Sequence, residues 1–415
     1  MYATIRVLSP ALLLPGGGHA VSIPMAMLIL FVSAKLMAEA AERLNQPGIV
    51  GEIIAGVLIG PSVLGLLSPS EFLSAMSDLG AMFLLFRVGL EVRSSELMRV
   101  GGTALLVATS GVIVPFIMGA GILHFWGAGA NEAIFVGASL VATSVGITAQ
   151  VLSAKGLLNE ISSKVILAAA VIDDVLGLLV LAAVSSVTHG KLNILQLSAT
   201  ALLATAFTVI VAKWGTRAMG HIVPRIQESL RTAEARFVIA LSLLFALAVL
   251  AISTGVAAIV GAFLAGLALA ETAGPRERDL AQGVAEFLVP FFLAGIGLHV
   301  DLSAFAQPAT AILAIVLLAA AVVSKFVGCG LGALGLGKAE ALRIGVGMIP
   351  RGEVGMIVAQ IGLGFGILTR ASYGVVVFMS VATTIVAPPL IKLAYAEVLG
   401  SASIAASDEE ILRLG

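Results

Sequence analysis

Two adjacent carboxylates stand inside a long apolar run of this 415-residue chain. Residues 171–182 read VIDDVLGLLVLA, which places Asp173 and Asp174 far from the nearest predicted loop. A charge in the middle of a membrane span costs about 2.5–3.5 kcal/mol on insertion scales. Neighbouring side chains on a helix point about 100° apart, so one aspartate can meet a cation from another helix while the other opens onto water. A carboxylate that binds either a proton or a hard cation, but not both, is the minimum chemistry of exchange.

Three more charged residues lie deep in apolar segments, namely Lys325, Arg351 and Glu353. We expect them to pair or to line a hydrated cavity, because an isolated charge in hydrocarbon is costly. A buried ionic network that only ties helices together is the alternative interpretation. Lys35 lies four residues before Glu39 near the end of a predicted span, and this spacing predicts a pair on one helix face.

Two predicted spans contain residues that weaken a helix at its centre. The first, LVATSVGITAQVL (140–152), places hydroxyls at Thr143 and Ser144. The second, GMIPRGEVGMIVA (347–359), has a proline and three glycines around Arg351 and Glu353. Proline removes a backbone donor, and non-helical backbone at membrane depth is tolerated only where it lines protein or water. Interrupted spans in corresponding halves of a chain indicate the midplane site of a transporter.

The two interrupted spans occupy equivalent places. Each is the middle member of a triplet of spans, and the triplets begin seven spans apart, so they cross the membrane in opposite senses. This arrangement predicts an inverted repeat, although glycine and proline are also generally frequent in membrane helices. If the two broken helices cross, Arg351 and Glu353 would neutralise the exposed ends of the half-helices.

The composition requires an all-α integral membrane protein. Hydrophobic residues make up 59% of the chain and charged residues 11%, whereas soluble domains carry about 25% charged residues. A span needs about 20 apolar residues, and thirteen segments qualify: about 22–42, 48–66, 71–92, 102–124, 131–153, 161–186, 193–212, 234–252, 254–271, 283–300, 309–335, 340–363 and 372–393.

The positive charges set the expected orientation. With thirteen spans, the loops after odd-numbered spans lie on the same face of the membrane as the C-terminus. Sixteen of the 23 Lys and Arg residues fall on that face. The positive-inside rule then predicts a multi-pass protein of the cell inner (plasma) membrane with its N-terminus outside and its C-terminus in the cytoplasm. The formal net charge of −1 argues against a nucleic-acid partner.

Other classes of function fit less well. An intramembrane aspartyl protease also needs two aspartates, but they must converge from separate helices, whereas adjacent residues diverge. A passive channel does not need a protonatable pair at the midplane. The histidines form no ligand cluster in the sequence, so we expect no cofactor and no enzymatic activity.

Several motifs occur in the order found in a known family. The chain resembles bacterial cation:proton antiporters of the NapA type, within the monovalent cation:proton antiporter superfamily, in the stretches GEIIAGVLIGP (51–61), LGAMFLLFRVGLEV (79–92), VIDDVLGLLVLA (171–182), FFLAGIGLHVDL (291–302) and IPRGEVGMIVA (349–359).

The resemblance implies specific roles for the residues already singled out. Asp174 matches the carboxylate that binds the ion, and Asp173 the one that pairs with a lysine, which is expected at Lys325. Thr143 and Ser144 match the unwound stretch beside the site, and with the aspartates they would ligate a monovalent cation. The implied fold is NhaA/NapA-like, a homodimer whose protomers each combine a dimerisation domain with a six-helix core that moves like an elevator.

The expected domains follow from this resemblance. They are a leader at 1–21, a dimerisation or scaffold domain at 22–100 and 234–308, a core transport domain at 101–190 and 309–393, a linker helix and basic cytoplasmic loop at 191–233, and a short cytoplasmic tail at 394–415. The expected activity is electrogenic exchange of cytoplasmic sodium or lithium for external protons, which would serve sodium and pH homeostasis. Potassium/proton exchange at the same site is the alternative, because oxygen donors alone do not reveal cation size selectivity.

Overall fold

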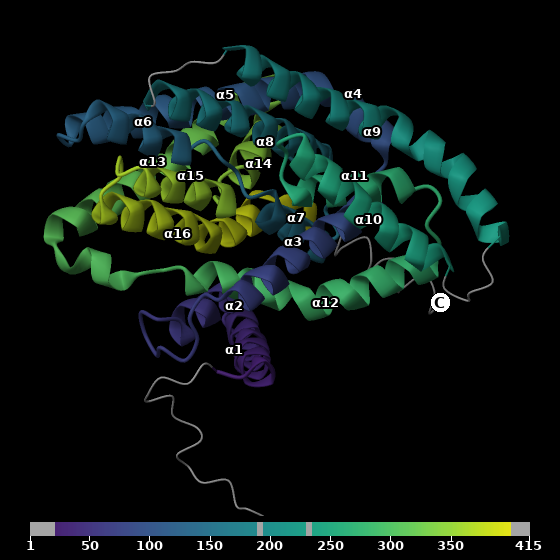
Figure 1. Cartoon of the computed structure of the whole chain (residues 1–415), viewed down its shortest axis with the longest axis horizontal. Helices are drawn as coiled ribbons and strands as arrows, with labels where there is room; N and C mark the ends of the chain where they lie inside the picture. The colour runs from purple at the N-terminus through teal and green to yellow at the C-terminus, as the bar shows by residue number, and fades with distance from the viewer. Residues whose placement is uncertain (1–20, 189–193, 230–234, 400–415) are drawn as a thin grey trace, which may run out of the picture.

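The computed structural model describes residues 21–188, 194–229 and 235–399, and in these ranges every regular element is a helix (Figure 1). The described α-helices are α1 (Ile23–Arg43), α2 (Gly48–Ile59), α3 (Glu71–Glu91), α4 (Ser94–Arg99), α5 (Gly101–Phe125), α6 (Ala130–Ser139), α7 (Val145–Ala154), α8 (Ile161–Thr188), α9 (Ile194–Ser229), α10 (Ala235–Ser253), α11 (Ala258–Leu269), α12 (Pro275–Leu298), α13 (Pro308–Gly332), α14 (Lys338–Gly347), α15 (Glu353–Gly364) and α16 (Arg370–Ala394). Nearly all of the expected leader, residues 400–415 of the expected tail and parts of the expected linker region lie outside the described residues.

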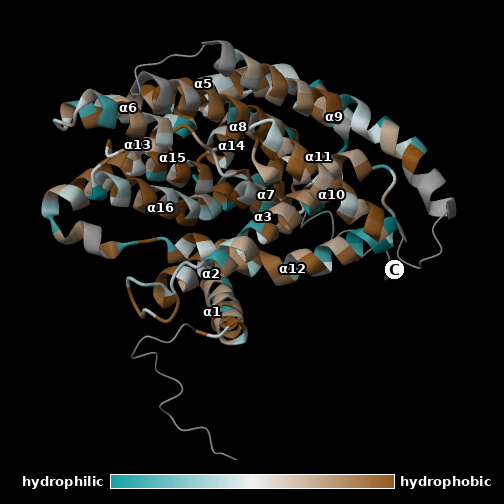
Figure 2. Cartoon of the chain, viewed as in Figure 1, coloured by the Kyte–Doolittle hydropathy of each residue, from teal (hydrophilic) through white to brown (hydrophobic). Residues whose placement is uncertain are grey.

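The helices have the length and composition of membrane spans. Within the described ranges, seven helices are long and apolar enough to cross a bilayer, and four shorter apolar helices accompany them. Large hydrophobic side chains such as Leu105, Ile117 and Ile315 face outward, and hydrophobic residues cover much of the helix surfaces (Figure 2). Outward-facing leucine and isoleucine at this density suit lipid rather than water. The prediction of an all-helical membrane protein is therefore confirmed.

One set of helices packs through glycines, and we call it the scaffold: α1, α2, α3, α10, α11 and α12. Within it, α3 packs on α11 and α12, and α2 packs on α1 and α12. A Cβ on Gly56 would lie 1.9 Å from the carbonyl oxygen of Ala294, and one on Gly297 would lie 2.2 Å from that of Ile53. The backbones of α2 and α12 therefore touch, which only glycine permits.

The second set of helices, which we call the core, comprises α5 to α8 and α13 to α16. In it α5 packs on α13, α6 packs on α5 and α15, and α16 packs on α13 and α15. Figure 1 shows most of the core helices grouped above α1, α2 and α12 of the scaffold. The two sets meet where α3 contacts α7 and where α2 contacts α16.

Helix α9 differs from the expectation for residues 191–233. A linker helix followed by a basic cytoplasmic loop was expected there, but the helix continues without interruption to Ser229. Gly215 lies against Ala268 of α11, and the Thr216 hydroxyl donates to the carbonyl oxygen of Leu267 at 3.3 Å. Polarity ends a membrane span but not a helix, because lysine and arginine are good helix formers.

Candidate functional site

The two interrupted spans cross at their breaks. Helix α6 ends at Ser139 and α7 begins at Val145, while α14 ends at Gly347 and α15 begins at Glu353. The backbone N–H of Ser144 donates to the carbonyl oxygen of Pro350 at 2.8 Å. A Cβ on Gly352 would lie 2.7 Å from the Cβ of Ser144, so the Gly352 backbone packs directly against the Ser144 side chain.

A second hydrogen bond supports the crossing from one side. The hydroxyl of Thr148, on α7, donates to the carbonyl oxygen of Gly347 at 2.6 Å, and its side chain is fully buried. Gly347 is the last residue of α14, whose final carbonyl oxygens have no partner within their own helix. The Thr148 hydroxyl therefore caps α14 from the partner half-helix.

Arg351 closes the end of the opposite half-helix. Its Nη1 donates to the carbonyl oxygens of Val141 at 3.1 Å and Ala142 at 3.0 Å, just beyond the C-terminus of α6. Its Nη2 donates to the carbonyl oxygen of Ala321 on α13 at 3.3 Å. A helix C-terminus carries partial negative charge, so this fully buried guanidinium both satisfies backbone carbonyls and compensates that charge. The side chain of Glu353 lies outside the described residues; its backbone begins α15.

Lys325 and Asp173 form an ion pair between α13 and α8. The Lys325 Nζ lies 3.0 Å from Asp173 Oδ1 and 3.2 Å from Oδ2, and the two side chains are 0% and 1% exposed. Removing one partner of such a buried pair strongly destabilises the protein, because the other charge is left without compensation. The close packing beside it depends on Gly111 of α5, where a Cβ would lie 3.4 Å from Lys325 Nζ.

Asp174 has a different environment from its neighbour. It keeps 7% of its surface accessible, against 1% for Asp173, and the helix geometry turns it away from the direction of Lys325. Helix α8 packs against both α6 and α7, so the aspartates lie on a helix that adjoins the break. Thr143, inside that break, is 5% exposed, and its Oγ1 has no hydrogen-bond partner in the described residues. An orphaned buried hydroxyl is unusual and suits an oxygen ligand of a cation.

Sequence reasoning missed several contributors to this region. Ser380, Thr383 and Thr384 of α16 are fully buried, and Thr383 Oγ1 accepts a hydrogen bond from the backbone N–H of Arg351 at 3.1 Å. The signal was present, because three hydroxyls within five residues of an apolar helix require partners.

The expected pairing of Lys35 was wrong. Lys35 pairs with Glu52 of α2, with Nζ 2.9 Å from Oε1, whereas Glu39 pairs with Arg43 at 2.8 Å. Spacing along one helix did not decide the partner, because Glu52 is 6% exposed and needs a cation more than an exposed glutamate does.

Comparisons with known proteins agree with these features. The family model described as "Sodium/hydrogen exchanger, transmembrane" matches residues 27–395. The chain is 36% identical to the high-affinity Na⁺/H⁺ antiporter NhaS3 of Synechocystis, over 89% of each protein. It is 33% identical to the Na⁺/H⁺-K⁺ antiporter GerN of Bacillus cereus, over 88% of this chain and 95% of the relative.

A solved structure shares the fold. The sodium proton antiporter MjNhaP1 of Methanocaldococcus jannaschii aligns with a TM-score of 0.64 at 19% identity, over 90% of this chain and 96% of that chain. The resemblance drawn from the motifs is therefore confirmed. With a family match across most of its length and relatives above 30% identity, the chain belongs to the sodium/hydrogen exchanger family of membrane transporters.

Proposed function

We propose that this protein exchanges Na⁺ or Li⁺ for H⁺ by alternating access, with Asp174 as the group that binds one or the other. The proposal is carried by one observation: the buried carboxylate of Asp174, which is 7% exposed, lies on a helix that adjoins the two crossed half-helix pairs and follows an aspartate already compensated by Lys325. The names of the relatives, Na⁺/H⁺ antiporters, support the choice of ions.

The neighbouring groups have distinct roles in this proposal. Thr143 and the backbone around Ser144 supply further oxygens to the cation, and Asp173 completes the acidic site. Lys325 holds Asp173 ionised when the cation is bound. If the Asp173–Lys325 pair also takes up and releases a proton, two H⁺ enter for each Na⁺ that leaves. One net charge then moves inward per cycle, and a membrane potential contributes about 2.3 kcal/mol per 100 mV.

The topology we propose has thirteen membrane crossings, with each interrupted span counted once. The N-terminus lies outside and the C-terminus in the cytoplasm of the plasma membrane, as the Lys and Arg distribution indicates. The three spans made by α5, the broken pair α6 and α7, and α8 form an inverted repeat with the three spans made by α13, the broken pair α14 and α15, and α16. The core slides against the scaffold, and the scaffold carries a homodimer interface.

Potassium/proton exchange is the second candidate, and one relative favours it. GerN, at 33% identity, is described as a Na⁺/H⁺-K⁺ antiporter. The same carboxylate and hydroxyl oxygens would coordinate K⁺. Selectivity between Na⁺ and K⁺ then depends on the size of the site when the cation is bound.

The test uses purified protein in proteoliposomes with an imposed pH gradient. Wild-type protein should collapse the gradient on addition of Na⁺, and Asp174→Asn should not, while it retains the wild-type melting temperature within about 5 °C. Normal Na⁺-driven proton release by Asp174→Asn would overturn the assignment of the site. Adding K⁺ in place of Na⁺ decides between the candidates, and the reversal potential under combined Na⁺ and pH gradients gives the charge per cycle.

A further inference from the structure

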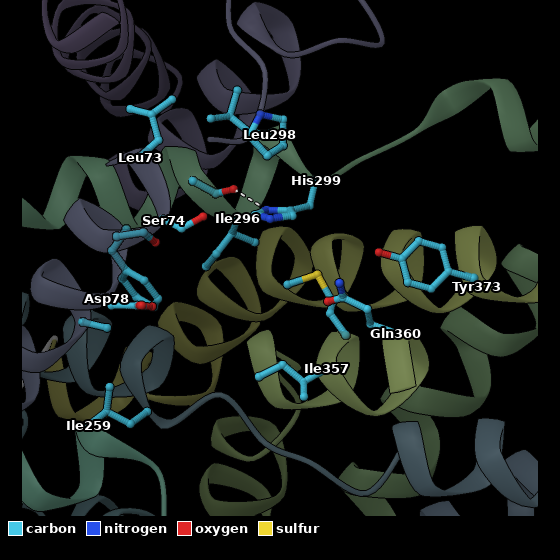
Figure 3. A pocket seen from close by; sticks show the side chains of 16 residues that line it. Leu73, Ser74, Asp78, Ile259, Ile296, Leu298, His299, Ile357, Gln360 and Tyr373 are labelled. Carbon is cyan, nitrogen blue, oxygen red and sulfur yellow. Dashed lines mark hydrogen bonds between the residues drawn. The ribbon is translucent and has the colours of Figure 1, made fainter. Parts of the chain in front are cut away.

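A cavity at the boundary of scaffold and core has no place in the exchange mechanism so far. It has a volume of about 180 Å³ and lies between α3 and α12 of the scaffold and α15 and α16 of the core. Figure 3 shows Ser74 and Asp78 across the cavity from Gln360 and Tyr373, with His299 at its rim. We call it the Asp78 cavity. In the proposed topology it opens toward the outside.

Asp78 is the negative charge of this cavity. Its side chain is exposed, and among the described residues no lysine, arginine or histidine lies within ion-pair distance of it. The nearby titratable groups are His299, whose Nδ1 lies 2.8 Å from the carbonyl oxygen of Gly295, and the Tyr373 hydroxyl. The carboxylate therefore stands uncompensated in a confined space, where its field is screened less than on an open surface.

The floor of the cavity lies next to the crossing. Phe292 lines the cavity, and a Cβ on Gly146 would lie 3.2 Å from two carbon atoms of the Phe292 ring. Gly146 follows Ser144 by two residues, in the first turn of α7. One aromatic ring thus separates the Asp78 cavity from the half-helix that begins at the break.

A short internal repeat places a glutamine in the lining of each of two cavities. Residues 147–151 read ITAQV and residues 357–361 read IVAQI, each on the half-helix that follows a break. Gln360 lines the Asp78 cavity, and Gln150 lines a second cavity of about 640 Å³ that also contains Glu52. We call the latter the Glu52 cavity. It adjoins the start of α2, whereas the Asp78 cavity adjoins the opposite end of the scaffold helices.

The two cavities each contain a core glutamine but differ in charge. The lining of the Glu52 cavity has three carboxylates and three ammonium groups, from Glu39, Glu42, Glu52, Lys35, Lys155 and Lys392, and Glu52 itself pairs with Lys35 at 2.9 Å. The lining of the Asp78 cavity has one carboxylate and no lysine or arginine. A monovalent cation is therefore attracted to the Asp78 cavity more strongly than to the Glu52 cavity.

We propose that Asp78 and Gln360 form an outer access site for an alkali cation, through which Na⁺ passes to and from Asp174. The carboxylate of Asp78 and the amide oxygen of Gln360 are hard oxygen donors of the kind that such cations prefer. Because one donor belongs to the scaffold and the other to the core, the site changes when the core moves. This inference rests on the proposed exchange and adds an asymmetry: the apparent cation affinity depends on Asp78 at one membrane face only.

The test measures Na⁺ dependence from each face separately, in right-side-out and everted membrane vesicles. Asp78→Asn should raise the apparent KM for Na⁺ by about three- to tenfold at the Asp78 face, the effect of one nearby charge at intermediate dielectric. At the opposite face, KM and the maximal rate should stay near the wild-type values. Glu71→Gln, which removes an exposed charge from the same helix outside the cavity, is the matched control and should leave both KM values unchanged.

A charge-restoration experiment separates electrostatics from shape. The native Cys329 is fully buried, so a cysteine at position 78 is the accessible target for a thiol reagent among the described residues. In Asp78→Cys, a sulfonatoethyl methanethiosulfonate adduct restores negative charge and should lower KM toward wild type. A trimethylammonium adduct adds positive charge and should raise it further.

Three outcomes would overturn the outer access site: an unchanged KM at the Asp78 face, equal changes at both faces, or equal effects of the two adducts. These failures differ from failure of the proposed function. If Asp174→Asn is inactive and Asp78→Asn behaves as wild type, only the access site is wrong. If wild-type protein exchanges no Na⁺, the proposed function is wrong.

Discussion

The backbone N–H of Ser144 donates to the carbonyl oxygen of Pro350, and this 2.8 Å hydrogen bond joins the breaks of two spans that are far apart in the chain. Thr148 and Arg351 reinforce the same contact, each by binding carbonyl oxygens at the end of a half-helix on the other span. Non-helical backbone is tolerated at membrane depth only when its polar groups have partners. The two breaks supply those partners to each other, and helix α8, with both aspartates, packs beside them.

The first prediction concerns the buried ion pair. Lys325→Ala or Asp173→Asn alone should each destabilise the protein by about 3–5 kcal/mol, because each leaves one buried charge without a partner. The double variant Asp173→Asn with Lys325→Met should be more stable than either single variant. Melting temperatures in detergent measure this order. A double variant that melts below both single variants would contradict a pairwise interaction.

The same variants also test the role of the pair in charge movement. Lys325→Ala should reduce the current per transported Na⁺, or shift its pH dependence, on a solid-supported membrane. The proposed second proton is carried by the Asp173–Lys325 pair, so its removal alters the charge per cycle. An unchanged current and pH profile would exclude Lys325 from the transport cycle and leave it a structural role.

The second prediction concerns Arg351. Lysine keeps the charge but cannot bind the carbonyl oxygens of Val141, Ala142 and Ala321 together, since its ammonium lacks the guanidinium fork. Each buried carbonyl left without a donor costs about 1–3 kcal/mol, so Arg351→Lys should melt lower and exchange more slowly than wild type. Arg370→Lys, at an exposed position at the start of α16, is the control and should change neither quantity. If Arg351→Lys were as stable as wild type, the positive charge alone would be enough to stabilise the crossing, without the guanidinium hydrogen bonds.

The third prediction concerns the close approach at the crossing. Gly352→Ala places a methyl group 2.7 Å from the Cβ and Oγ of Ser144, so the crossing must open. Overpacking of this kind costs about 1–3 kcal/mol, and exchange activity should fall because the break is displaced from α8. Gly364→Ala, where no atom lies within 4 Å of the added Cβ, should retain activity. Equal activities of the two variants would argue against a rigid crossing.

The fourth prediction concerns pH and Glu96, which lies between two spans and pairs with Lys164 near the start of α8. The Lys164 ammonium lies 2.9 Å from Glu96 on the short helix α4, and its hydrogen bond lowers the pKa of Glu96 below the ordinary value of 4.5. A lowered pKa in the folded state means that the pair stabilises the protein above pH 4.5. This stabilisation is lost as the pH falls through the lowered pKa.

The matching measurement compares Glu96→Gln with wild type across pH. Because the pair is partly exposed, the variant should be less stable at pH 7 by no more than about 1 kcal/mol. The difference in melting temperature should shrink as the pH falls below 4.5. A difference that persists unchanged at pH 3 would show that Glu96 acts through packing rather than through its charge.

The sequence alone was sufficient to predict the properties that depend on local composition. Hydrophobic length predicts the helices and their membrane setting, since each span must bury its own backbone and face lipid. The cost of a charge in hydrocarbon singled out Asp173, Asp174, Lys325 and Arg351 before any contact was known. Proline, glycine and hydroxyl residues indicated where two spans would be interrupted.

Only the tertiary structure decided which groups meet. That Lys35 selects Glu52 over Glu39, that Arg351 binds the carbonyl oxygens of Val141 and Ala142, and that Asp78 stands opposite Gln360 all depend on the rotation and depth of helices far apart in the chain. Those positions depend on close contacts at glycines: Gly56 meets the backbone of Ala294, Gly111 meets the Cys329 side chain, and Gly352 meets the Ser144 side chain. Hydrophobicity drives every span into the membrane alike, and the fit of small residues determines how the spans are arranged once there.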